Sequence, residues 1–157
     1  MRTALVLLAS CLTLAVSAAD RPAGDAIDLG KVTFAGKAEP GSLITATVQF
    51  TIREGHHIKS SKPTQEYAIP TKVTLTGTNG VKPGPVRYGA TKPIAVAGEG
   101  TEPGYEGEMT VVIPLTLAAD AKFPVTVPGV LSYQACEGKT CYPPRKLKFE
   151  LKVGESK

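Results

Sequence analysis

The chain has 157 residues, a formal net charge of +4 at pH 7, sixteen glycines, thirteen prolines and no tryptophan. Its basic residues are scattered and form no dense Lys/Arg run interleaved with aromatic residues, so the composition gives no support to nucleic-acid binding. The many turn-forming residues and the few helix-favouring stretches favour a turn-rich β domain.

Residues 1–19 have the pattern of a signal peptide. Arg2 supplies a positive charge, residues 4–16 are mostly apolar, and small residues follow, so cleavage is expected after Ala18 or Ala19. The apolar stretch is too short to span a membrane as a helix. We therefore expect export to the periplasm, a compartment in which disulfides form and exchange.

A minor alternative for the same segment is a lipid anchor. Residues 8–11 read Leu-Ala-Ser-Cys, which matches the pattern after which bacterial lipoproteins are cut and acylated, here on Cys11. After removal of the signal, about 140 residues remain, which suits one domain with an adequate core. We expect a flexible lead-in over residues 20–29, a domain over residues 30–153 and a tail over residues 154–157.

Apolar and polar residues alternate with period two over much of this domain, which is typical of half-buried strands. The alternation is clearest at residues 147–153, and Pro114 within residues 109–117 predicts an edge position for that strand. The other expected strands are 31–35, 44–52, 71–76, 86–88, 123–127 and 130–135, with glycine-rich loops at 78–85 and 97–104. Seven or eight strands joined by Gly/Pro turns predict an all-β, immunoglobulin-like antiparallel β-sandwich.

The two histidines of the chain, His56 and His57, are adjacent and follow one of the expected strands. A polar turn with one partly buried histidine is the simplest interpretation. A role for His56 beside a functional site is the alternative. Tyr88 and Tyr142 lie in or beside loops, where core packing is the default role of an aromatic residue.

Cys136 and Cys141 lie in the connection between the strands expected at residues 130–135 and 147–153. Four residues separate them, so a disulfide between them closes only across a tight turn. A loop of about six residues constrains the unfolded chain by roughly 2 kcal/mol, against nearly 5 kcal/mol for a hundred-residue loop. The pair is therefore a weak staple, and its spacing favours thiol–disulfide exchange, in which one cysteine resolves a mixed disulfide formed by the other.

Three other interpretations of the pair remain open from the residues alone. The first is an inert clasp of a hairpin, as in many stapled secreted domains. The second is a zinc or copper site shared with His56 and His57, although adjacent histidines on a strand point to opposite faces. The third is a free dithiol without a function. The residues show no Ser-His-Asp, paired-carboxylate or phosphate-loop constellation, so hydrolase and transferase chemistry have no support.

The residues around the pair resemble a known family. Tyr133-Gln134-Ala135-Cys136 and Cys141-Tyr-Pro-Pro are similar to the Tyr-Gln-x-Cys…Cys-Tyr-Pro-Pro signature of the N-terminal periplasmic domain of bacterial thiol:disulfide interchange proteins of the DsbD type. Residues 55–63 and 67–71 also resemble members of that family, and the similarity covers residues 30–153.

The resemblance implies a fold, a site and partners. The fold is an immunoglobulin-like sandwich, Cys141 forms the mixed disulfide with a partner, and Cys136 resolves it. An aromatic cap loop covers the pair, and Tyr88-Gly89 is its nearest match here. Tyr142 and Pro143 adjoin Cys141, where they would shield the sulfurs or contact a partner, and His56 belongs to the same group of site residues.

In the family, a membrane-embedded DsbD-like electron transporter reduces the pair, which then reduces periplasmic disulfide isomerases or thioredoxin-like proteins of cytochrome c maturation. Two departures are visible: four residues separate the cysteines where the best-known members have five, and neither a membrane domain nor a thioredoxin-like domain is present in this sequence. We therefore expect a separate reductant protein.

The prediction from the sequence is a monomeric relay protein of the protein-disulfide reductase type, without cofactor or metal, that exchanges disulfides through Cys136 and Cys141. The alternative is a non-catalytic exported binding module in which the same disulfide is structural.

Overall fold

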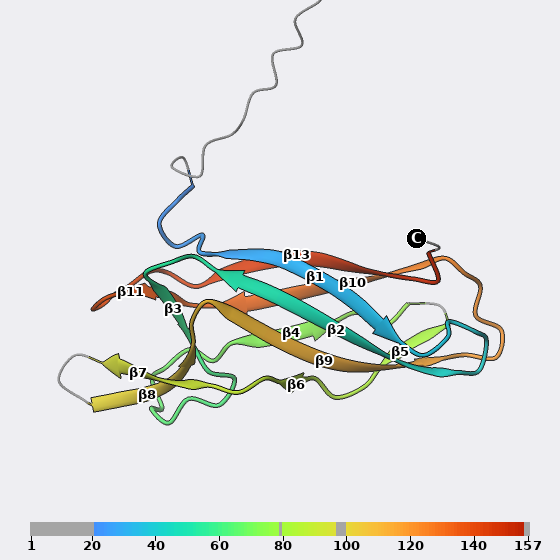
Figure 1. The fold of residues 1–157 in the computed structure, drawn as a ribbon, viewed down its shortest axis with the longest axis horizontal. Helices are drawn as coiled ribbons and strands as arrows, with labels where there is room; N and C mark the ends of the chain where they lie inside the picture. Colours follow the sequence, from blue (N-terminus) through green and yellow to red (C-terminus); the bar gives the residue numbers. More distant parts are fainter. Residues whose placement is uncertain (1–20, 79, 97–99, 156–157) are drawn as a thin grey trace, which may run out of the picture.

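The computed structural model describes residues 21–78, 80–96 and 100–155, all of them in strands, turns and loops of an all-β fold (Figure 1). The signal peptide expected over residues 1–19 lies outside these residues. The strands are β1 (Ile27–Ala35), β2 (Leu43–Ile52), β3 (His56–Lys59), β4 (Lys72–Leu75), β5 (Val81–Pro83), β6 (Arg87–Tyr88), β7 (Lys92–Val96), β8 (Gly100–Tyr105), β9 (Glu108–Leu117), β10 (Val125–Tyr133), β11 (Ala135–Glu137), β12 (Thr140–Cys141) and β13 (Arg145–Val153).

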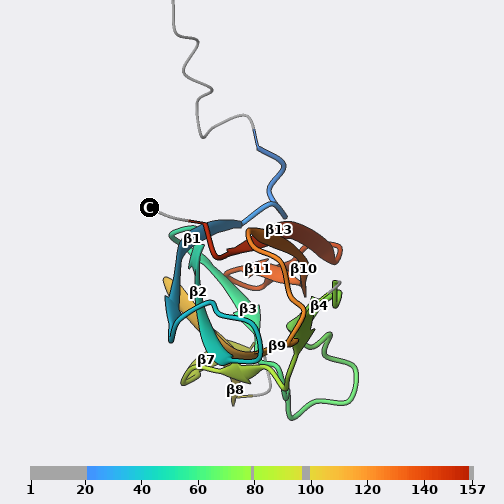
Figure 2. The same cartoon turned by 90° about the vertical axis from the view of Figure 1, so that its right-hand side faces the viewer.

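The strands form three sheets. The first has the order β1-β2-β9-β5, with β6 also paired to β9, and the second has the order β13-β10-β4. Viewed from the end, β1 and β2 lie on one side and β10 and β4 on the other (Figure 2). The third sheet, β12-β11-β3-β8-β7, closes one end of the molecule (Figure 1). The predicted antiparallel sandwich is confirmed.

The core lies between the first two sheets and follows the alternation of the sequence. In β2 and β9, the residues at every second position are buried while their neighbours are half-buried or exposed. Phe50 of β2 meets Phe149 of β13 edge to face, with ring centroids 5.4 Å apart and an interplanar angle of 78°. Such a T-shaped pair adds about 0.5–1.5 kcal/mol beyond the burial of its area and joins the two sheets directly.

Strand β9 is an interior strand, so the edge position predicted from Pro114 is wrong. β9 pairs with β2 along one side and with β5 and β6 along the other. The carbonyl of Pro114 accepts a hydrogen bond from the Gly84 N–H at 2.8 Å, and Gly84 follows the last residue of β5. Because the N–H and C=O of one residue face the same neighbour in an antiparallel ladder, the missing N–H of Pro114 faces the interruption between β5 and β6.

The two strands expected at residues 123–127 and 130–135 are one strand, β10, whose ladder with β13 runs without a break through Pro128 and Gly129. Gly129 is needed there, because a Cβ atom at this position would lie 2.4 Å from Cζ of Phe149. The glycine therefore lets the phenyl ring lie across the strand. Pro-Gly is a turn signal in the sequence, and this packing keeps it within a continuous strand instead.

Several short elements differ from the expected loops and turns. Residues 56–59 form β3 instead of a polar turn, and all four are buried. The loop expected at 78–85 contains β5, and residues 100–104 of the loop expected at 97–104 belong to β8, while residues 97–99 lie outside the described residues. Strand β3 was missed because a strand covered on both faces shows no alternation.

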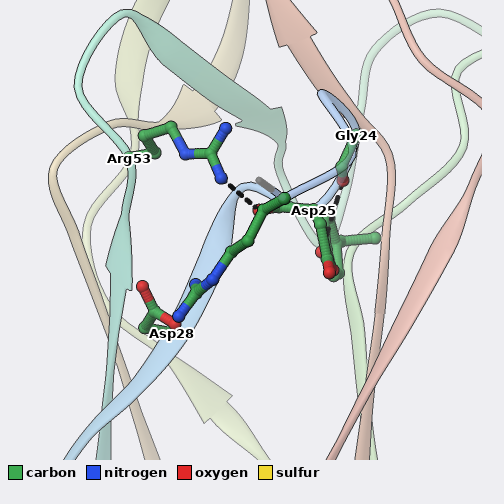
Figure 3. A network of polar contacts seen from close by, with 6 residues as sticks. Gly24, Asp25, Asp28 and Arg53 are labelled. Atoms are coloured by element: carbon green, nitrogen blue, oxygen red, sulfur yellow. Dashed lines mark hydrogen bonds and ion pairs between the residues drawn. The ribbon is translucent and has the colours of Figure 1, made fainter. Parts of the chain in front are cut away.

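The segment before β1 is attached to the sandwich by polar contacts (Figure 3). The Arg53 guanidinium donates to the Asp25 carbonyl at 3.1 Å, and the Arg21 guanidinium pairs with the Asp28 carboxylate. The hydroxyl of Tyr133 donates to the Gly24 carbonyl at 3.4 Å. Strand β1 begins at Ile27, four residues before its expected start at Lys31, so it includes part of the stretch expected as a lead-in.

Candidate functional site

The cysteine pair lies in a two-stranded hairpin at one end of the sandwich. Cys136 in β11 is directly opposite Cys141 in β12, their Cα atoms are 4.0 Å apart, and their sulfurs form a disulfide. The hairpin turns through two residues, of which Gly138 has a φ of +55°. A glycine with positive φ at the first central position is the requirement of a type II′ turn. The tight turn expected from the spacing is present, and the cysteines are in strands on either side of it.

The two cysteines differ in exposure. Cys136 has 0% of its surface accessible, and its strand β11 is an inner strand between β12 and β3. Cys141 is exposed, since β12 is the edge strand of the third sheet. A partner that approaches the disulfide therefore meets Cys141, while Cys136 is covered by protein.

The register of three adjacent strands divides the neighbouring side chains between two faces. Cys136 pairs with Cys141 on one side and with His57 on the other, and directly opposite residues of a ladder share a face. His57, Cys136 and Cys141 therefore form a row on one face. Successive residues of a strand point to opposite faces. His56 and its ladder partner Glu137 consequently lie on the other face of the hairpin.

His56, Glu137 and Tyr142 form a polar cluster on that second face. The Tyr142 hydroxyl donates to Oε2 of Glu137 at 2.7 Å, and this hydrogen bond to a carboxylate raises the pKa of the tyrosine. The rings of His56 and Tyr142 are stacked, with centroids 6.1 Å apart and an angle of 24° between their planes. Nε2 of His56 lies 3.9 Å from Oε2 of Glu137. The cluster thus fixes Tyr142, the residue that follows Cys141.

The imidazole of His56 is 6% exposed, and its two ring nitrogens have different surroundings. Its Nδ1 is 3.2 Å from the Glu54 carbonyl oxygen, which only accepts hydrogen bonds, so Nδ1 is the donor. Nε2 is buried and has no hydrogen-bond partner among the described residues. In the neutral imidazole, Nε2 is therefore an acceptor with a free lone pair next to the carboxylate of Glu137.

The backbone of Tyr142 continues the hairpin. Its N–H donates to the Ala135 carbonyl at 2.9 Å, and its carbonyl accepts from Nε2 of Gln134 at 3.1 Å. A Cβ atom on Gly24 would lie 3.0 Å from Cβ of Tyr142, so the segment before β1 packs against this residue. Pro143 follows and is exposed. The Gln and Tyr of the motif thus hold the end of β12 in place.

His57 is the functional candidate whose position the sequence did not indicate. It is 7% exposed, and its pKa is lowered by burial and by the charge of Lys59, with a partly opposing effect of Glu106. The β3–β8 ladder pairs Ile58 with Tyr105, so the next residues, His57 and Glu106, are opposite each other when the register is extended. The expected polar turn with one partly buried histidine is wrong, because β3 buries both histidines.

Tyr88 is in another part of the fold. It belongs to β6, which pairs with β9 in the first sheet, and its hydroxyl accepts a hydrogen bond from the Val73 N–H at 2.8 Å. Burial raises its pKa. Tyr88 also lines a cavity of about 620 Å³ together with residues of the 60–62 segment and Tyr105. Tyr88 thus contacts β4 and β9 and shares a cavity with Tyr105 of β8, whereas His56 and Tyr142 lie at the hairpin.

Two further findings concern metals and membranes. Within residues 21–78, 80–96 and 100–155, no group of three or more His, Cys, Asp or Glu side chains is placed to hold a metal ion. A helix with the length and apolarity needed to cross a membrane is also absent from the described residues.

Comparisons with known proteins agree with the fold and the motif. The family described as "Thiol:disulfide interchange protein DsbD, N-terminal" matches residues 26–153. The N-terminal periplasmic domain of ScsB from Proteus mirabilis is similar in structure, with a TM-score of 0.58 and 16% identity over 86% of this chain and 49% of that chain. Because the identity is low, this likeness shows the fold alone.

Two structures from Neisseria meningitidis are also similar. The reduced N-terminal domain of DsbD has a TM-score of 0.47 and 20% identity over 77% of this chain and 83% of that chain. A complex between the DsbD and PilB N-terminal domains gives a TM-score of 0.46 and 18% identity over 76% of this chain and 79% of that chain. Among curated proteins, no sequence matches this chain.

Proposed function

Because this chain belongs to the family of DsbD N-terminal domains, we propose that it relays reducing equivalents between proteins by thiol–disulfide exchange at Cys136 and Cys141. The observation that carries the proposal is the unequal exposure of the two cysteines, one fully buried and one exposed within a single disulfide. Exchange requires an accessible sulfur for the partner and a second sulfur close by that resolves the mixed disulfide.

The reaction runs in two displacements. In the reduced protein, the Cys141 thiolate attacks a partner disulfide, so a Cys141–partner bond forms and the partner's own bond breaks. The Cys136 thiolate then attacks Sγ of Cys141, so the intramolecular disulfide forms and the partner leaves as a dithiol. Two electrons and two protons pass from the pair to the partner. A dithiol reductant returns the pair to its reduced state by the reverse sequence.

The site supports the roles of the neighbouring residues in this reaction. The exposed Cys141 and Pro143 belong to the surface that a partner meets first, and Tyr142 between them is held by Glu137 and His56. As in the family, the partners proposed are a membrane-embedded electron transporter as reductant and periplasmic thioredoxin-like proteins or disulfide isomerases as acceptors. The proposal includes export of the chain to the periplasm, where such partners are found.

Trapping of mixed disulfides tests the proposal. Reduced Cys136→Ser and Cys141→Ser variants, both with Cys11→Ser to remove the third thiol, are incubated with oxidised glutathione or with a purified oxidised thioredoxin-like domain. We expect Cys136→Ser to accumulate a stable Cys141 mixed disulfide, while the buried thiol of Cys141→Ser reacts far more slowly. Equal and negligible reaction of both variants would show that the disulfide is a structural clasp, which is the competing interpretation.

A further inference from the structure

We propose that His57 is the proton acceptor for the Cys136 thiol in the step that resolves the mixed disulfide, and the proton donor to Cys136 in the reverse step. The inference deepens the proposed function and depends on it. It concerns the buried half of the pair, which has no access to a base in solution.

The need for an internal base follows from burial. The thiolate is the nucleophile of exchange, and burial in apolar surroundings disfavours the thiolate form of a cysteine. Cys136 is 0% exposed and is enclosed between β12 and β3. Water is therefore a poor acceptor for its proton, and a neighbouring side chain with a free lone pair is required for fast resolution.

His57 is placed to meet that need. It is the ladder partner of Cys136 and shares a face with it, and side chains in this relation have Cβ atoms about 4.5–5.5 Å apart. An imidazole and a thiol at this spacing are within reach of each other. The row Cys141, Cys136, His57 crosses three adjacent strands. Glu106, the residue after β8, would be opposite His57 if the β3–β8 register continued by one residue.

The charges around His57 favour the neutral, proton-accepting form. Burial and the Lys59 ammonium on the same face of β3 lower its pKa, and adjacent His56 has the same effect to a smaller extent. Glu106, the residue that follows β8, opposes them by stabilising the imidazolium. An imidazole of this kind is unprotonated at neutral pH, and the carboxylate stabilises the positive charge that arises when the proton is taken.

The Cys136 S–H proton passes to a ring nitrogen of His57, and the resulting thiolate attacks Sγ of Cys141. The Cys136–Cys141 bond forms while the bond from Cys141 to the partner breaks, and the partner sulfur leaves as a thiolate. The imidazolium then releases its proton to that thiolate or to solvent, which restores neutral His57.

The experiment measures the resolving step separately. The reduced protein in a Cys11→Ser background reacts with oxidised glutathione, and acid-quenched samples are analysed by mass spectrometry for the glutathione adduct over pH 5–9. In His57→Asn, we expect the adduct to form at the normal rate but to disappear roughly 10²-fold more slowly at pH 7, the lower end of the range for general acid–base catalysis. The resolving rate of His57→Asn should also reach its plateau at a higher pH than that of the wild type.

The matched control is Thr71→Val. Thr71 is 1% exposed, and its hydroxyl donates to the carbonyl of Lys59 in β3. The change therefore perturbs the same strand without removing a side chain of the site. We expect its resolving rate and pH profile to remain close to those of the wild type. If His57→Asn and Thr71→Val resolve at the same rate with the same pH profile, the assignment of His57 is wrong, while exchange itself stands. If no adduct forms in any variant, the proposed function fails first.

A measurement on the protein with its native His57 tests the proposal without depending on the folding of a variant. The His57 ring is followed by NMR as a function of pH in the oxidised and reduced proteins. We expect its titration midpoint to change on reduction, because a thiol then replaces the disulfide beside it. An identical His57 titration in both states would contradict the proposal.

Discussion

Reduction of the disulfide should lower the free energy of unfolding by only about 2 kcal/mol. The closed loop runs from Cys136 to Cys141, a sequence separation of 5. The chain-entropy relation gives about 2 kcal/mol for a loop of six residues at 25 °C, whereas a hundred-residue loop gives about 4.7 kcal/mol. In the folded state, β11 keeps its ladder with β3, so the loss of native contacts is confined to the short edge strand β12.

The assay is urea unfolding of the oxidised and the reduced protein, with the double variant Cys136→Ser/Cys141→Ser as a control for the reductant. We expect the midpoint to fall on reduction while the slope of the free energy against urea stays the same, since the surface exposed on unfolding hardly changes. The double variant should show no effect of the reductant. A loss of about 4 kcal/mol or more on reduction would refute the reasoning and favour a structural clasp.

Three further predictions concern single side chains. Burial by itself would raise the pKa of Glu102, but hydrogen bonds from the 64–65 segment hold it below the ordinary value. The ionised Glu102 should therefore contribute its full share to the free energy of unfolding above about pH 4.3, and this contribution should be lost as the pH falls below that value. Glu102→Gln should flatten this acid dependence in thermal unfolding, and an unchanged slope would contradict the assignment. Gly129→Ala should destabilise the fold by about 1–3 kcal/mol in urea, because its Cβ would collide with Phe149, and a neutral effect would show that the ring relaxes freely. Glu137→Gln should lower the raised pKa of Tyr142 toward its usual range in tyrosinate absorbance at high pH, whereas an unaltered titration would exclude the hydrogen bond as the cause.

The sequence predicted the parts of the fold in which one face of a strand is buried and the other is solvated. Alternation alone predicts strands β2 and β13, and the structure buries their alternating apolar residues except Leu147, which is half-buried. Strand β3 was missed because it is covered on both faces and is four residues long. The proline in β9 was interpreted as the mark of an edge, yet an interruption between two partner strands accommodates it equally well.

The candidate site was predictable to a different extent. The cysteine motif indicated a pair closed across a tight turn and placed Tyr142 beside it, because both are local in the chain. The relation of Cys136 to His57 was not predictable, since it depends on the register between strands 79 residues apart in the sequence. Register is set by the packing of whole strands, and a shift of one residue would exchange the roles of the two histidines.

The reduction potential of the Cys136–Cys141 pair is the most direct test of the relay. The protein in the Cys11→Ser background is equilibrated with dithiothreitol buffers of defined ratio, and the fraction of reduced pair is measured after alkylation. The relay predicts a potential above about −300 mV, within the range of proteins that exchange disulfides. A markedly lower potential, typical of structural disulfides, would contradict it.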